Sequence, residues 1–390
     1  MKKIAILVFF TVGFFVHVWA CTGLTDGKQA TVDGSVLVTY SADSHTLYGA
    51  LTSSPAADWP KGSMRSIVEW DTNKPLGEIE QVEHTYAVIG NMNEHQLTVV
   101  ESTWGGCPEL VDTTGIIDYG SLMQLALERA KTAREAIKVM TGLVKKYGYY
   151  SSGESFTIAD PNEAWILDLI GKGPGRRGAV WVAVRIPDDC IAGHANYPRI
   201  HKIPMDDKEN CLYSPDVISF AREMGYFDGL NKDFSFARAY SPADFGALRA
   251  CDARVWSFFR KYDSTMDNYL PYVNGESAEP FPLYVKPSRK LSVQDMKEAM
   301  RDHFEDTPFD MTQDVGAGPF KVPYRFRPMS FEVDGKSYCM ERAIATQQTG
   351  FTLVGQMRNW LPDPVGGVLW FGVDDANTCV YIPMYCGITQ

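Results

Sequence analysis

Cys21 is the residue best suited to covalent chemistry, because of the segment that precedes it. Two lysines follow Met1 and come before an apolar stretch over 4–20. A short basic region before an apolar core is typical of a secretory signal peptide. Val18 and Ala20 supply the small residues preferred three and one positions before a cut. Cleavage after Ala20 would make Cys21 the mature N-terminus.

An N-terminal cysteine carries a thiol nucleophile and a free α-amine on one residue. The amine titrates near pH ~7.7–8.0 and the thiol near ~8.5, so the amine can accept the thiol proton without a histidine. Two alternatives are a lipoprotein anchor, which bulky Trp19 fits poorly, and a buried or disulfide-bonded cysteine. Taken alone, Cys21 leaves all three open.

The sequence after Cys21 favours the nucleophile. Cys21-Thr22-Gly23-Leu24-Thr25 leads into 35–44, and further motifs follow in order at 90–97, 151–156, 193–200, 240–245, 252–256 and 370–375. In order and spacing these segments resemble the secreted cysteine dipeptidases of the dipeptidase A type. That group belongs to the N-terminal-nucleophile hydrolases and is related to bile salt hydrolases and penicillin V acylases.

The resemblance implies a fold and a domain organisation. It predicts an α+β protein, a four-layer α-β-β-α sandwich of the N-terminal-nucleophile hydrolase type. A signal peptide would occupy 1–20 and one hydrolase domain 21–390. Pattern alone would indicate only a mixed α/β or α+β chain.

Hydrophobic periodicity and turn signals predict the individual elements. Strands are expected at 36–41, 85–90, 96–102, 156–159, 164–170, 180–186, 368–373 and 379–384. Helices are expected at 121–130, 132–146 and 292–304, and after Ser214-Pro215 and Ser241-Pro242, where serine, threonine or proline begins the helix. The segment 268–290 is expected to be a long connection.

The resemblance also implies roles for residues around Cys21. Asp43 matches the acid that holds the α-amine over the thiol, and its alternative is a turn cap at a strand end. Asn196 matches the donor to the tetrahedral oxyanion, or else is a turn residue before Pro198. Arg254 matches an arginine that reaches the site from a helix, or else is a solvated helical residue.

Three further positions are expected to contact substrate. Tyr40 stands where many family members have an arginine that lowers the thiol pKa. Its presence leaves activation to the α-amine, or to another arginine such as Arg254. Thr103 stands where some acylase relatives have an oxyanion asparagine. His194 lies within a matched motif, although its default role is packing or a hydrogen bond.

Composition excludes several other classes. Hydrophobic residues make up 45% and charged residues 22%, as expected of a globular protein with a substantial core. The formal charge of −11 falls to about −13 without the two leader lysines, which argues against a nucleic-acid partner. No apolar run after residue 20 is long enough for a membrane span.

The remaining cysteines lack metal-ligand spacing. Neither they nor the histidines predict a metal site, and no cofactor is expected. Cys379 and Cys386 flank a strand-like segment and are one candidate disulfide. The resemblance leaves a homo-oligomer open.

These observations predict a secreted or periplasmic cysteine dipeptidase that acts through an acyl-enzyme on Cys21, with a dipeptide or other small molecule as substrate. One alternative is an amidase or acylase acting on conjugated bile acids or acyl-lactams. An alternative of another class is a lipid-anchored or inactive binding protein.

Overall fold

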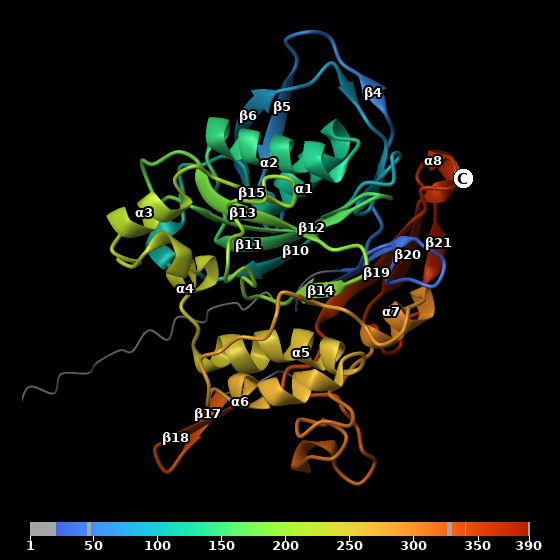
Figure 1. Cartoon of the computed structure of the whole chain (residues 1–390). Helices are drawn as coiled ribbons and strands as arrows, with labels where there is room; N and C mark the ends of the chain where they lie inside the picture. The colour runs from blue at the N-terminus through green and yellow to red at the C-terminus, as the bar shows by residue number, and fades with distance from the viewer. Residues whose placement is uncertain (1–20, 45–47, 326–329, 340, 389–390) are drawn as a thin grey trace, which may run out of the picture.

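Two antiparallel sheets form the centre of the protein (Figure 1). The computed structural model describes residues 21–44, 48–325, 330–339 and 341–388. The first sheet has the order β16 (Tyr284–Val285), β14 (Ile191–His194), β1 (Thr22–Asp26), β2 (Val36–Asp43), β19 (Thr349–Met357), β20 (Val368–Val373) and β21 (Ile382–Met384).

The second sheet carries the middle of the chain. Its order is β15 (Cys211–Tyr213), β13 (Ala179–Ile186), β12 (Ala164–Gly171), β11 (Gly153–Ala159), β10 (Thr98–Trp104), β9 (Met92–Asn93), β8 (Val88–Ile89) and β3 (Ser53–Ser54). Three ribbons lie outside the sheets: β4 (Ala57–Asp58) with β7 (His84–Thr85), β5 (Met64–Val68) with β6 (Pro75–Glu80), and β17 (Ser330–Val333) with β18 (Lys336–Cys339).

Helices cover the outer faces of both sheets (Figure 1). The second sheet is covered by α1 (Tyr119–Arg129) and α2 (Ala133–Tyr147), and the first by α5 (Ala253–Arg260), α6 (Leu270–Val273) and α7 (Val293–Ala299). Shorter helices are α3 (Val217–Glu223), α4 (Phe236–Tyr240) and α8 (Asp363–Gly366). Within the described part of the chain, no helix is long and apolar enough to cross a membrane.

Alternation along the strands produces these layers, since successive side chains of a strand point to opposite faces. In β2, Val36 and Val38 pack between the two sheets, in one cluster with Val100 of β10. Leu37 points the other way and packs with Val255 of α5. Buried residues on the outer face of the second sheet pack with α1 and α2. The layers are therefore helix, sheet, sheet, helix, which agrees with the predicted sandwich.

Most predicted strands are present, and three helix starts need correction. The helix expected to begin at Pro215 begins at Val217, as α3. Asp118, not Ser121, caps α1, because its side chain accepts the Ser121 N–H. The helical segment before α5 is capped by Asp244 rather than Ser241, through the Ala247 N–H at 2.8 Å. Ser292 caps α7 with a capping box, as predicted. The strands predicted at 85–90 and 96–102 do not pair with each other as a hairpin, because β9, inside the expected turn, lies between β8 and β10 and pairs with both.

The candidate disulfide between Cys379 and Cys386 is wrong. The thiol of Cys386 donates to the Ala87 carbonyl at 3.2 Å, and that of Cys379 points to the Ala376 carbonyl at 3.7 Å. The two sulfurs therefore face different backbones. All seven cysteines that the structure describes are unbonded.

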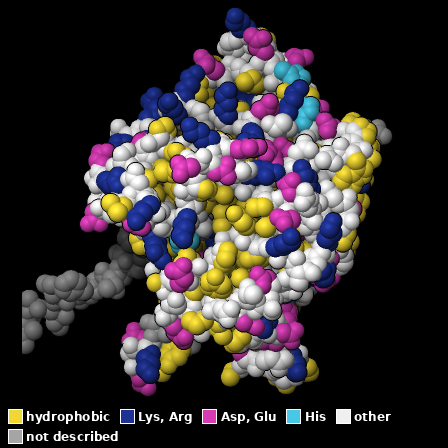
Figure 2. All heavy atoms as spheres, in the orientation of Figure 1, with side chains coloured by type: hydrophobic (Ala, Val, Ile, Leu, Met, Phe, Trp, Pro, Cys, Tyr) yellow, Lys and Arg dark blue, Asp and Glu magenta, His cyan; other side chains and the backbone are white. Residues whose placement is uncertain are grey.

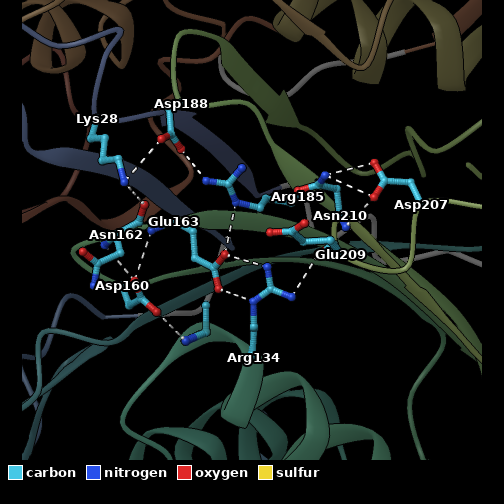
Figure 3. A network of polar contacts seen from close by, with 11 residues as sticks. Lys28, Arg134, Asp160, Asn162, Glu163, Arg185, Asp188, Asp207, Glu209 and Asn210 are labelled. Carbon is cyan, nitrogen blue, oxygen red and sulfur yellow. Dashed lines mark hydrogen bonds and ion pairs between the residues drawn. The ribbon is translucent and has the colours of Figure 1, made fainter.

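A partly exposed network of ion pairs joins the two sheets (Figure 3). Glu163, in the β11–β12 turn, accepts two hydrogen bonds from Arg134 of α2 and one from Arg185 of β13. Arg185 also pairs with Asp188 at 2.5 Å. Asp188 in turn pairs at 3.3 Å with Lys28, which lies just after the end of β1. The network ties α2, the second sheet and the end of β1 together.

Candidate active site

One cavity lies between the sheets where β1 begins. Its empty space is about 790 Å³, counting the open solvent at its mouth. Its wall includes Cys21, Tyr40 and Asp43 from the first sheet, Glu101 and Thr103 from the second. Residues of α1 and the β5–β6 turn complete it. None of the labelled residues of the ion network in Figure 3 lines this cavity.

The first two strands bring the nucleophile and Tyr40 together. Gly23 pairs with Tyr40 in the antiparallel β1–β2 register, and the Tyr40 hydroxyl lies 3.6 Å from the Cys21 sulfur. A side chain at position 23 would not fit, because a Cβ there would lie 2.8 Å from the His194 ring. Glycine therefore allows the closely packed start of β1.

Asp43 is buried at the end of β2 and held from two sides. It forms an ion pair with Arg342 and accepts the Thr349 hydroxyl at 2.5 Å. Thr349 pairs with Asp43 in the β2–β19 register. Burial raises the pKa of Asp43, while the charge of Arg342 opposes that rise. Neither Arg342 nor Thr349 was predicted, since no local motif marks them.

Arg254 is fully buried, and all three nitrogens of its guanidinium donate hydrogen bonds. Its Nη1 donates to the Cys21 carbonyl at 2.9 Å and to the Thr22 hydroxyl at 2.7 Å. Its Nη2 donates to Asn196 Oδ1 at 2.7 Å and to the Ala195 carbonyl, and its Nε to the Ala250 carbonyl. The five bonds match the five donors of a guanidinium. Arg254 thus fixes the start of β1 against the end of β14, and is not a solvated helical residue.

Asn196 follows β14 after one intervening residue, with φ at 57°, and is not among the residues that line the cavity. Arg254 donates to its Oδ1, so its Nδ2 faces the other way and donates to the Thr103 carbonyl at 2.5 Å. Its backbone N–H donates to the Ser102 hydroxyl at 3.1 Å. The side-chain amide is therefore fixed in orientation between Arg254 and the Thr103 carbonyl.

His194 was expected to contact substrate, and the structure corrects this. The side chain is fully buried between the sheets and does not line the cavity. Its ring nitrogens engage Ser102 Oγ at 2.6 Å and Thr157 Oγ1 at 2.9 Å. Burial, with the charge of Arg254, lowers the pKa of His194 to about 3. It is a neutral packing histidine.

Two glutamates face the nucleophile from the second sheet. Glu101 accepts a hydrogen bond from the Tyr40 hydroxyl, and Glu154 accepts one from Thr103 Oγ1 at 2.6 Å. Burial raises the pKa of both carboxyls, and the charge of Glu101 raises that of Glu154 further. Sequence reasoning missed this pair. The signal available was a charged residue, Glu101, directly after the apolar pair Val99-Val100 in the predicted strand.

The surroundings of Cys21 hold its thiol protonated. Burial raises the pKa of Cys21 well above its usual range, and the negative charges of Glu101 and Asp43 raise it further. The hydrogen bond with Tyr40 acts in the opposite direction. A base or a new positive charge beside the sulfur is therefore required before it can attack.

Of the predicted site residues, Cys21, Tyr40, Asp43 and Thr103 line the cavity.

Comparison with known proteins identifies the family of this chain. The profile of peptidase family C69 matches residues 20–390. This chain belongs to peptidase family C69. It is thus a cysteine peptidase, and the resemblance inferred from the sequence motifs is confirmed.

Proteins of similar sequence agree with the C69 assignment. A probable dipeptidase of Salmonella dublin is 26% identical, over 95% of this chain and 81% of its own length. Dipeptidase A of Lactobacillus helveticus is 24% identical, over 95% of this chain and 76% of its own length. A dipeptidase of Bifidobacterium longum is 23% identical, over 93% and 70% of the two chains.

Proposed function

We propose that this C69 peptidase is a secreted dipeptidase of the N-terminal-nucleophile hydrolase type, with Cys21 as its mature N-terminus. The observation that carries the proposal is the cavity that Cys21 lines while Arg254 holds the Cys21 carbonyl. Relatives named as dipeptidases match nearly the whole chain. The leader-like segment over 1–20 supports export and cleavage.

Cleavage of the leader before Cys21 supplies the base that the thiol lacks. A free α-amine on Cys21 takes the thiol proton, and the sulfur attacks the peptide carbonyl carbon. The tetrahedral intermediate collapses to a thioester as the ammonium gives its proton to the leaving amine. Water then attacks the thioester, with the amine as base again, and releases the amino acid. Before cleavage this nitrogen is an amide and cannot accept a proton.

Asp43 and Asn196 have separate roles in this scheme. Asp43, fixed by Arg342 and Thr349, accepts a hydrogen bond from the α-amine and keeps it over the sulfur. Asn196, oriented by Arg254, donates to the developing oxyanion. Arg254 is a positioning residue, because its donors are used within the protein.

The test compares two forms of one protein. The mature form begins at Cys21, and the second carries one added glycine before Cys21, which leaves the fold intact and converts the amine to an amide. We expect the mature form to hydrolyse alanyl-alanine and the extended form to retain less than about one thousandth of that rate. N-terminal sequencing and intact mass check each form. Normal turnover by the extended form, or a diacylglyceryl mass on Cys21, would overturn the proposal.

A further inference from the structure

The cavity has acidic groups and no basic ones. Asp43, Asp71 and Glu101 line it, and no lysine or arginine is among its lining residues in the described chain. Asp43 is paired with Arg342. Asp71, at the exposed mouth, accepts the Tyr119 hydroxyl at 2.9 Å. Glu101 accepts the Tyr40 hydroxyl.

Glu101 retains unused capacity to accept hydrogen bonds. It is 1% exposed, and no donor among the described residues reaches its Oε2 or the Oε2 of Glu154 behind it. The two carboxyls are in hydrogen-bonding contact with each other. An ionised carboxylate offers about four acceptor positions. Tyr40 and Glu154 occupy two of those of Glu101.

The position of Glu101 relative to the Cys21 sulfur suits a peptide substrate with a free α-ammonium. Tyr40 OH contacts both the Cys21 sulfur, at 3.6 Å, and a Glu101 oxygen. In a peptide with a free N-terminus, the ammonium nitrogen lies about 2.5 Å from the first carbonyl carbon, as backbone bond lengths require. When Cys21 attacks that carbon, the ammonium therefore lies within reach of a group one side chain away from the sulfur.

We propose that Glu101, with Glu154 behind it, binds the α-ammonium of the residue whose carbonyl Cys21 attacks. The substrate class is then peptides with an unblocked N-terminus, and N-acyl compounds are excluded. This inference rests on the proposed function and adds the group that selects the substrate. A buried carboxylate without its cation disfavours a neutral group in the same place, because the charge stays unpaired.

The test uses the mature protein with two substrates of nearly equal shape. Alanyl-alanine has the ammonium, and lactoyl-alanine has a neutral hydroxyl in its place. We expect the wild type to prefer alanyl-alanine in kcat/KM by about 100-fold. Glu101→Gln should lower kcat/KM for alanyl-alanine by about 10- to 100-fold and leave lactoyl-alanine within about threefold.

Glu128→Gln is the matched control. Glu128 is also buried, on helix α1 that covers the second sheet, but it pairs with Arg65 and does not line the cavity. Glu128→Gln should leave the preference for alanyl-alanine over lactoyl-alanine unchanged. Thermal melting and the rate of Cys21 alkylation by iodoacetamide check that Glu101→Gln is folded with a reactive thiol.

The outcomes separate the two proposals. Hydrolysis of alanyl-alanine without a preference over lactoyl-alanine by the wild type overturns the ammonium site alone. An equal loss on both substrates in Glu101→Gln also overturns it, since Glu101 would then act only through Tyr40. Hydrolysis of neither substrate by a wild-type protein with a free N-terminal Cys21 overturns the proposed function, and the ammonium site with it.

Discussion

The two sides of Cys21 differ in how their polar groups are satisfied. On the side of the helices α5–α7, Arg254 forms five hydrogen bonds, and Asp43 is held by Arg342 and Thr349. On the side of the second sheet, Glu101 and Glu154 each leave an oxygen without a donor among the described residues. Both sides are buried, so solvent does not explain the difference.

The difference separates a scaffold from a binding surface. A buried group with every bond made is at its lowest free energy without a ligand, and its removal mainly costs stability. A buried acid with unused acceptors gains when a cation arrives. Substitutions on the first side should therefore act on folding and on the position of the amine. Those on the second should act on the thiol and the substrate.

The largest effect is expected at Cys21, where the two sides meet. Cys21→Ala should lower dipeptide hydrolysis by at least about a thousandfold, because no other described side chain at the cavity offers a nucleophile of this kind. The circular dichroism spectrum and melting temperature should change little. Cys21→Ser should keep a small residual rate. A Cys21→Ala protein with most of its activity would mean that another group performs the attack.

Arg254→Gln tests the scaffold side. Loss of a buried guanidinium with five partners should lower the free energy of unfolding by about 3–5 kcal/mol, measured in urea, because several carbonyls lose their donor. Arg222→Gln is the control, since Arg222 is exposed and bonds only to Gly229 and Asn231. A cost of Arg254→Gln as small as that of the control would contradict the comparison.

Asp43→Asn should lower kcat by about 100-fold and shift its pH dependence. The carboxylate favours the ammonium form of the α-amine, so its loss lowers the amine pKa. The free amine then persists to lower pH, and the acid limb of the kcat profile moves down. Profiles of both proteins on alanyl-alanine measure this. An acid limb that stays in place would separate Asp43 from the amine.

Features of the site were predictable from the sequence where the residues involved lie close together along the chain. Cys21 and Asp43 lie in two neighbouring matched motifs, 21–25 and 35–44, so local motifs located both. Arg342 reaches Asp43 across 299 residues, and no local pattern encodes such a contact. The strand β19 was also missed, because glycines interrupt its apolar alternation. Arg254 and Asn196 were matched by motif, but only the structure revealed the bond between them.

His194 lies between the two sides and predicts a pH effect on stability. Its folded pKa is about 3, while an unfolded histidine titrates near ~6.5. Between these values only the unfolded chain binds the proton, so stability falls as pH falls. From pH 7 to pH 5 this costs about 2 kcal/mol. His194→Gln should lose that part of the pH dependence in urea unfolding, whereas His84→Gln, at an exposed site, should keep it.

The smallest effect is expected at Tyr40, which belongs to β2 of the first sheet and donates its hydroxyl to Glu101 on the second side. Tyr40→Phe removes the hydroxyl that contacts the sulfur and lowers the pKa of the thiol. The thiol pKa should rise, and alkylation by iodoacetamide at pH 7 should slow by about three- to tenfold. The rate measured from pH 6 to pH 10 gives the shift. An unchanged alkylation profile would leave Tyr40 as a packing residue.

The position of β19 has a consequence for the order of folding. This strand begins at Thr349, yet it pairs with β2 along its whole length and lies between β2 and β20. The strand that bears the nucleophile thus has its sheet completed only after synthesis has passed residue 357. Contacts so distant in sequence form slowly, because a long loop must close first. The nascent chain therefore carries its reactive cysteine for most of its synthesis without the groups that make it an enzyme.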